Sequence, residues 1–236
     1  MWTGFLLAAI GVVLAWFLDL GSVAPFLAVS MGSGFQILTA VGWVVGAAGA
    51  VLLVGGTALA FAGRRPFEFT FGGKAALALI LLLVSLLFTF LALRFLLGKV
   101  DEFRAGLDPL GVAWMFKSVL LWAFVFPILA LSGCLLLAFD LQGERGIRLA
   151  FVGVLAFAAA GLAGVLAGWL LIDVASQSPF ASTFYGAIGP PLLLQRSIDI
   201  AWRLVFAVLF VQTHRRIAHG EIPVPPEMGA PAYVSA

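Results

Sequence analysis

Residues 75–97 form an apolar run that contains no charged side chain before Arg94. About 20 apolar residues in a helix, at about 1.5 Å each, are enough to cross the ~30 Å hydrocarbon layer of a bilayer. Five further apolar runs repeat this pattern, and short polar segments separate them. The predicted spans are 1–18, 36–62, 75–97, 114–139, 149–172 and 189–214. The sequence therefore predicts an all-α fold, a polytopic membrane helix bundle of about six transmembrane helices.

Composition supports a membrane protein and excludes a soluble one. Hydrophobic residues make up 63% of the chain and charged residues 10%, whereas a soluble domain carries about 25% charged residues. The mean hydropathy is +1.16. The net charge is only +2, and no basic surface suited to nucleic acid stands out. The lipid bilayer is the expected surrounding, and nucleic acid is not expected as a partner.

The two ends of the chain differ in character. The first apolar run lacks a basic leading segment and a small-residue cleavage site before Asp19, so we expect it to be retained. Residues 19–34 are rich in Gly, Pro and Ser and are too short to cross, so they are interfacial or re-entrant. Residues 1–216 are predicted to form a single transmembrane domain, and residues 217–236 a flexible, Pro-rich cytoplasmic tail.

Orientation follows from the basic residues in the predicted loops. With six spans, the N-terminus, the tail and the loops at 64–74 and 140–148 share one side, and that side holds Arg64, Arg65, Lys74, Arg145, Arg148, Arg215 and Arg216. The loops on the other side, predicted at 19–34, 99–113 and 173–191, hold only Lys99 and Arg104. The positive-inside rule therefore predicts that both termini are cytoplasmic, in a multi-pass protein of the plasma (inner) membrane.

The last span carries three charges in an otherwise apolar run: Arg196, Asp199 and Arg203. Arg203 lies eleven residues before His214, which is roughly 16 Å along a helix and close to the middle of the bilayer. Asp199 is four residues away on the same helical face, so we expect an ion pair that faces the bundle. The alternative is a tilted helix in which Arg203 extends outward beside its carboxylate.

Three more charged residues are predicted near the same side of the membrane: Arg94, Lys117 and Asp173. Together with Arg196, Asp199 and Arg203 they form the candidate intramembrane polar site. One interpretation is a cap of paired charges that holds the helix ends together. The other is a water-filled vestibule on the outer side that leads to Arg203.

Small residues recur at helical spacing in two of the spans. The second span contains Gly42 and Gly46, and the fifth contains Gly153, Gly161, Gly164 and Gly168. Glycines on one helix face allow the backbones of two membrane helices to approach closely. We therefore expect both spans to make close helix contacts, in particular through Gly46 and Gly164.

No motif for catalysis, cofactor binding or metal binding is present. The chain contains no phosphate-binding loop, nucleophile elbow, HExxH or CxxC sequence, and Cys134 is the single cysteine. Three classes of function stay open. The first is a transport component, such as a permease, channel or transporter subunit. The second is a non-catalytic structural or assembly subunit with membrane-protein partners or a second copy. The third is a membrane-embedded lipid-modifying enzyme.

Overall fold

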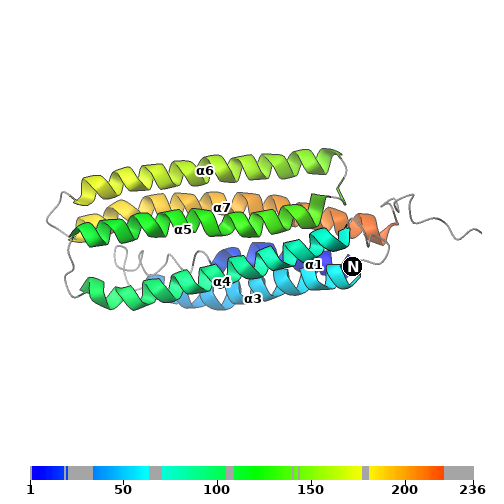
Figure 1. The fold of residues 1–236 in the computed structure, drawn as a ribbon, viewed down its shortest axis with the longest axis horizontal. Helices are drawn as coiled ribbons and strands as arrows, with labels where there is room; N and C mark the ends of the chain where they lie inside the picture. The colour runs from blue at the N-terminus through cyan, green and yellow to red at the C-terminus, as the bar shows by residue number, and fades with distance from the viewer. Residues whose placement is uncertain are drawn as a thin grey trace, which may run out of the picture.

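The computed structural model describes residues 2–18, 20, 34–63, 71–104, 109–139, 141–142, 144–176 and 181–220. Its helices are α1 (Trp2–Leu14), α3 (Gly34–Ala62), α4 (Phe71–Arg104), α5 (Pro109–Phe139), α6 (Glu144–Ser176) and α7 (Ala181–Ala218) (Figure 1). These described residues contain no strand. The predicted all-α fold is confirmed.

The helices have the character of membrane spans. Within the described residues, four helices contain a stretch long and apolar enough to cross a bilayer: Ala40–Ala62, Gly72–Leu91, Leu120–Ala138 and Glu144–Val174. Large apolar side chains also cover the outward faces of these helices, where a soluble bundle would carry polar ones; Val44 is 72% exposed and Leu170 68%. The chain is an integral membrane helix bundle. The number of crossings stays a prediction, because α1 is shorter than a span and α7 contains charges.

The helices pack around a closed ring in the order α1, α3, α4, α5, α6 and α7, with α7 returning to α1. The long axes lie side by side, and the N-terminus and the C-terminal end of α7 lie at the same end of the bundle (Figure 1). Of the neighbouring pairs in the ring, α3 and α4 are the least closely packed. The cytoplasmic placement of both termini stays a prediction.

The closest helix contact joins α1 to α3 and depends on glycine. A Cβ atom added at Gly46 would lie 2.0 Å from the backbone nitrogen of Leu18, and one added at Gly56 would lie 2.5 Å from that of Ala8. Distances this short leave no room for any side chain, so the two backbones are in direct contact. Gly42 is buried on the same helix. The glycine face predicted in the second span therefore packs on the first helix.

The glycines of α6 divide between two neighbours. A Cβ at Gly161 or Gly168 would lie 2.3 or 2.4 Å from side-chain atoms of α5. A Cβ at Gly153 would lie 3.2 Å from a side-chain atom of α7, which is still a tight contact, and a Cβ at Gly164 would lie 3.4 Å from one, which is an ordinary contact. The small-residue face of α6 thus serves α5 and α7 together, and it is tighter against α5.

A row of aromatic rings crosses the core from α5 to α1. It runs through Phe124, Phe157, Trp202, Phe206, Phe210 and Phe5, with successive ring centroids 5.6–6.2 Å apart. Tilted and edge-to-face rings at such distances attract one another beyond their simple burial. The row fixes the rotation of α7, which contributes three of these rings.

Two predicted loops are shorter than expected. The sequence predicts a loop over 99–113, but α4 continues to Arg104 and α5 begins at Pro109. Charged residues such as Lys, Glu and Arg are good helix formers once a helix leaves the apolar layer, and proline is favoured at the first position of a helix.

The second shortened loop precedes the last helix. The sequence predicts a loop over 173–191, but α6 continues to Ser176 and α7 begins at Ala181. Pro190 and Pro191 thus lie inside α7, where neighbouring helices can satisfy the carbonyls that proline leaves unpaired. At its other end α7 runs to Ala218, two residues beyond the predicted domain boundary. From residue 221 on, the predicted tail lies outside the described residues, as do nearly all of residues 19–34.

The link between α5 and α6 is bound to the far half of α7. Gln142 Nε2 donates to the Leu209 carbonyl at 2.8 Å and also to Thr213 Oγ1. Arg216 Nη1 donates to the Leu141 carbonyl at 2.7 Å. These bonds hold α7 in register with its neighbours at the end of the bundle where the termini lie.

Candidate functional site

The charged residues of α7 form one buried group, which we call the α7 charge cluster (Arg196, Asp199 and Arg203). Each of the three side chains is at most 5% exposed. Arg203 Nε donates to Asp199 Oδ2 at 3.3 Å, so the ion pair predicted from the four-residue spacing is present. Arg196 Nη1 lies 3.8 Å from the same carboxylate oxygen. One carboxylate is thus shared by two guanidinium groups, and the cluster carries one net positive charge.

Trp202 completes the surroundings of this cluster. Its Nε1 donates to Asp199 Oδ1, the carboxylate oxygen that the arginines do not use. Its ring also lies 4.6 Å from the guanidinium carbon of Arg203, within the range of a cation–π contact. Both oxygens of Asp199 therefore have partners, so this carboxylate is poorly suited to bind a further cation.

The end of α1 meets the cluster inside the bundle. α1 stops at Leu14, a turn follows at Ala15, and residues 16–18 are helical again. Arg203 Nη1 donates to the Val12 carbonyl at 3.2 Å. The last carbonyls of a helix lack partners within the helix and carry partial negative charge, so a cation is favoured there. Trp16 Nε1 donates in turn to the Arg196 carbonyl at 2.8 Å.

Some polar atoms at this level have no hydrogen-bond partner among the described residues. They are Nε and Nη1 of Arg196 and both side-chain polar atoms of Gln195. A buried donor that forms no hydrogen bond costs about 1–3 kcal/mol, and more when it is charged. This part of α7 is therefore less completely hydrogen-bonded than Asp199 and Arg203.

Arg203 lines a small cavity where several helices meet, which we call the central cavity. It has a volume of about 50 Å³ and is lined by residues of α3, α4 and α5, by Ala15 and Leu18, which follow α1, and by Arg203. Ser85 and Thr89 of α4 are the other polar residues in its wall. The cavity has room for little more than one water molecule or one small polar group.

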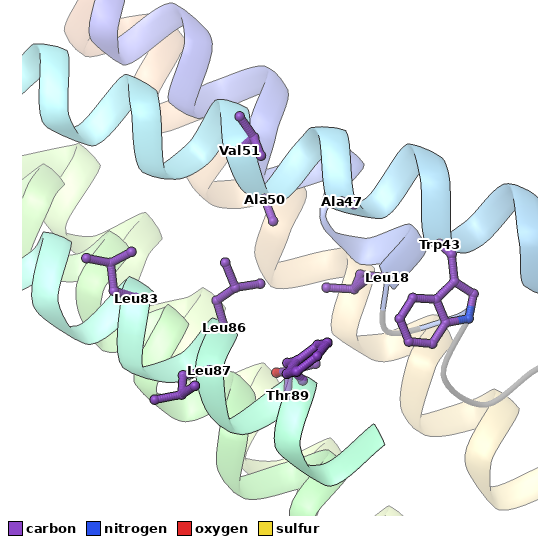
Figure 2. A pocket seen from close by; sticks show the side chains of 10 residues that line it. Leu18, Trp43, Ala47, Ala50, Val51, Leu83, Leu86, Leu87 and Thr89 are labelled. Atoms are coloured by element: carbon purple, nitrogen blue, oxygen red, sulfur yellow. The ribbon is translucent and has the colours of Figure 1, made fainter. Parts of the chain in front are cut away.

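A larger apolar space, the α3/α4 pocket, lies beside the central cavity. Its volume is about 560 Å³, and its lining is Leu18, Trp43, Ala47, Ala50, Val51, Leu83, Leu86, Leu87, Thr89 and Phe90. Figure 2 shows the side chains of α4 on one side of it and those of α3 on the other. Leu18, Ala50, Leu86 and Thr89 line both spaces, so the two adjoin. Val51 and Phe90 are exposed on the outer surface, so the pocket opens toward lipid.

The other residues of the predicted polar site lie apart from the α7 charge cluster. Lys117 of α5 forms an ion pair with Asp173 of α6, and its ammonium lies 5.9 Å from the Trp169 ring centroid. Asp173 is 58% exposed. Arg94 is exposed on α4. None of these three lines the central cavity or the α3/α4 pocket.

Several participants are absent from the prediction: Trp16, Ser85, Gln195 and Trp202. Trp202 follows Asp199 by three residues, so helical spacing could have placed it on the same face. Trp16 and Ser85 come from other helices, and only the packing of the chain brings them to α7. Within the part of the chain that the structure describes, no three His, Cys, Asp or Glu side chains gather in a way that could hold a metal ion.

Comparisons with known protein families, with curated proteins and with solved structures give no match to this chain.

Proposed function

We propose that the chain is a transport component of the plasma membrane, and that an anionic solute passes through the central cavity beside Arg203. The observation that carries the proposal is the α7 charge cluster, which is buried, carries one net positive charge and contributes Arg203 to the cavity wall. Ionisable groups inside a membrane bundle are costly, and they are typical of substrate and ion pathways.

A purely structural role accounts poorly for this cluster. Replacing a buried ion pair with well-packed apolar side chains is often neutral or stabilising, so a scaffold helix has little use for two arginines and one aspartate. Arg196 is a second buried cation whose Nε and Nη1 form no hydrogen bond among the described residues, and such donors lower the stability of the fold. A purely structural role therefore explains Arg196 least well. An anion passing through the site could accept hydrogen bonds from Nε and Nη1 of Arg196, which form none among the described residues.

The broken end of α1 supports the same proposal. Irregular backbone at membrane depth is tolerated where protein buries it or where it lines a cavity. Ala15, at the turn after α1, lies in the wall of the central cavity. Interrupted helices of this kind frequently surround substrate sites in transporters.

The glycine faces give no support to the alternative of a scaffold subunit. That alternative expects them to contact partner proteins. Gly56 packs instead on α1, Gly46 on Leu18 just after α1, and Gly161 and Gly168 on α5, all within the same chain. These surfaces are not available to a partner.

Flux in proteoliposomes tests the proposal. Purified protein should speed the decay of gradients of chloride, phosphate or small carboxylates, and leave a potassium gradient unchanged. A variant without the cluster, Arg196→Gln with Asp199→Asn and Arg203→Gln, should keep its thermal stability and lose the flux. Glu144→Gln serves as the control, because Glu144 pairs with Arg148 at an exposed helix end. Wild-type flux no faster than that of empty liposomes for every anion would contradict the proposal.

A further inference from the structure

We propose that Gln195 and Arg196 of α7 form a binding site for a small oxyanion that carries a hydroxyl group, such as bicarbonate or dihydrogen phosphate. Arg196 lies seven residues before Arg203, which is roughly 10 Å along the helix. The inference rests on the proposed function for the entry of anions to this depth, and deepens it by naming their class and a second position for them. Its test measures binding, so a failure of binding can be told apart from a failure of transport.

Both side chains are buried and lack hydrogen bonds. Gln195 is 5% exposed and Arg196 is 4% exposed. Nε2 and Oε1 of Gln195 and Nε and Nη1 of Arg196 form no hydrogen bond among the described residues. Buried polar groups in folded proteins nearly always have a hydrogen-bond partner, which can be a bound molecule. Four such atoms on two successive residues therefore favour a polar ligand at this place.

Asp199 does not fill this role, although it lies one helical turn away. Trp202 donates to Oδ1 of its carboxylate, and Arg203 donates to Oδ2. Arg196 Nη1 lies 3.8 Å from Oδ2, which is too far for a hydrogen bond. Nε and Nη1 of Arg196 are thus available to a second anion.

The unpaired atoms determine the chemistry of the ligand. The three nitrogens donate hydrogen bonds, and a guanidinium bonds most strongly to an acceptor that is negatively charged. Oε1 of Gln195 accepts, so it needs a donor such as a hydroxyl group. An oxyanion that keeps one proton offers both, whereas a halide or nitrate offers acceptors only. An ammonium ion offers donors only, and Arg196 would repel it.

Gly164 of α6 leaves space beside the Gln195 amide. A Cβ added at Gly164 would have Cβ, Cγ and Cδ of Gln195 as its nearest neighbours, at 3.4, 3.6 and 3.9 Å. These are ordinary contact distances, so a group of that size fits there. Further room can come from Gln195 and Arg196 themselves, because their unbonded ends can turn about the bonds of these long side chains. The site therefore suits an anion of only a few atoms.

Thermal unfolding of the purified full-length chain in detergent, followed by scanning fluorimetry in sealed capillaries, measures the binding. Potassium gluconate is replaced stepwise by potassium bicarbonate or potassium nitrate, at constant ionic strength and mildly alkaline pH. The two probes are planar monoanions of similar size, and only bicarbonate has a hydroxyl group. Bicarbonate should raise the melting temperature saturably, with a dissociation constant at least about tenfold lower than that of nitrate, because nitrate leaves Oε1 of Gln195 unpaired.

Substitutions of the two side chains isolate the site. Arg196→Gln should weaken the binding of both anions at least about tenfold. Gln195→Met keeps a side chain of similar length without the amide, and should reduce the preference for bicarbonate over nitrate to less than about twofold. Arg148→Gln is the control for a lost positive charge, because Arg148 is 77% exposed at a helix end; it should leave both dissociation constants within about twofold of the wild-type values.

A third substitution tests the position of the ligand. Gly164→Ala fills the space beside the Gln195 amide and should weaken bicarbonate binding about threefold or more. Gly153→Ala is the matched control, because Gly153 also lies on α6 but faces Val205 of α7, and it should change the dissociation constant by less than about twofold.

Three results would overturn the inference. They are the absence of any shift with bicarbonate, equal stabilisation of the wild-type protein by bicarbonate and nitrate, and a bicarbonate shift that Arg196→Gln leaves unchanged. Anion flux combined with equal binding of the two probes would remove this inference and leave the proposed function standing. Saturable, selective binding of bicarbonate without flux of any anion would do the reverse.

Discussion

At the scale of single residues, Asp199 holds the α7 charge cluster together. It accepts from Arg203 and Trp202 and lies within ion-pair distance of Arg196. The two arginines differ in how well they are paired. Arg203 also caps the Val12 carbonyl and lies over the Trp202 ring, whereas Nε and Nη1 of Arg196 form no hydrogen bond among the described residues.

The pairing within the cluster predicts a large loss of stability for Asp199→Asn and a small one for Arg196→Gln. Asp199→Asn leaves two buried cations without their counter-ion and should lower the free energy of unfolding by about 3–5 kcal/mol. Arg196→Gln leaves the balanced pair of Asp199 and Arg203 and should change stability by less than about 1 kcal/mol. Thermal unfolding in detergent, followed by scanning fluorimetry, compares the two. Equal destabilisation by both would contradict the weak pairing described for Arg196.

At the scale of helices, the contact between α1 and α3 is the most sensitive to volume. Gly56 points at α1, and a Cβ there would lie 2.6 Å from the Gly4 carbonyl oxygen. Gly55, its neighbour in sequence, has nothing within 4 Å of the same added atom. Both residues are glycines inside α3, so the same substitution at each position forms a matched pair that differs only in the contact with α1.

Gly56→Ala should therefore destabilise the protein by about 1–3 kcal/mol, because the two backbones must separate. Gly55→Ala should be neutral, or stabilising by up to about 1 kcal/mol, since alanine is the better helix former. The melting temperatures of the two purified variants test this. A Gly55→Ala variant that melts as low as Gly56→Ala would mean that α1 and α3 do not touch through this face.

Gly46 of α3 and Gly164 of α6 allow a second comparison of how much helix packing tolerates a larger side chain. Gly46→Leu should be more damaging than Gly164→Leu, because a Cβ at Gly46 would meet the backbone nitrogen of Leu18 at 2.0 Å, while a Cβ at Gly164 would meet Gln195 Cβ at the ordinary distance of 3.4 Å. The yield of folded monomer by size-exclusion chromatography would rank the two. The reverse ranking would contradict the packing described for α6.

At the scale of the whole molecule, much of the architecture could be predicted from sequence. Long apolar runs leave helices as the only option in lipid, because the backbone must satisfy its own hydrogen bonds. The pairing of Asp199 with Arg203 could also be predicted, since both lie on one helix. The central cavity could not, because Ser85, Ala15 and Arg203 come from three different parts of the chain that only the packing of the helices brings together. For the same reason Lys117 and Asp173 pair with each other and lie apart from Arg203.

The orientation in the membrane is a separate prediction at this scale. Cysteine at position 143 should be protected from an impermeant thiol reagent in intact cells, and Ser182→Cys should be labelled, because the basic residues mark the side of the termini as cytoplasmic. Cys134 is fully buried, so the native thiol should add little background. Labelling of Gly143→Cys from outside intact cells would show that the predicted orientation is wrong.

The measurement that tests the central claim most directly is the chemical reactivity of a cysteine placed in the central cavity. Ser85→Cys in a Cys134→Ser background puts a thiol in the same wall as Arg203. If anions pass this point, an anionic methanethiosulfonate should modify the thiol at least about tenfold faster than a cationic one, because the net positive charge concentrates anions there. Thr57→Cys is the control, since Thr57 is fully buried but does not line the cavity, and it should stay unmodified. No reaction at Ser85→Cys, or faster reaction with the cationic reagent, would contradict the account.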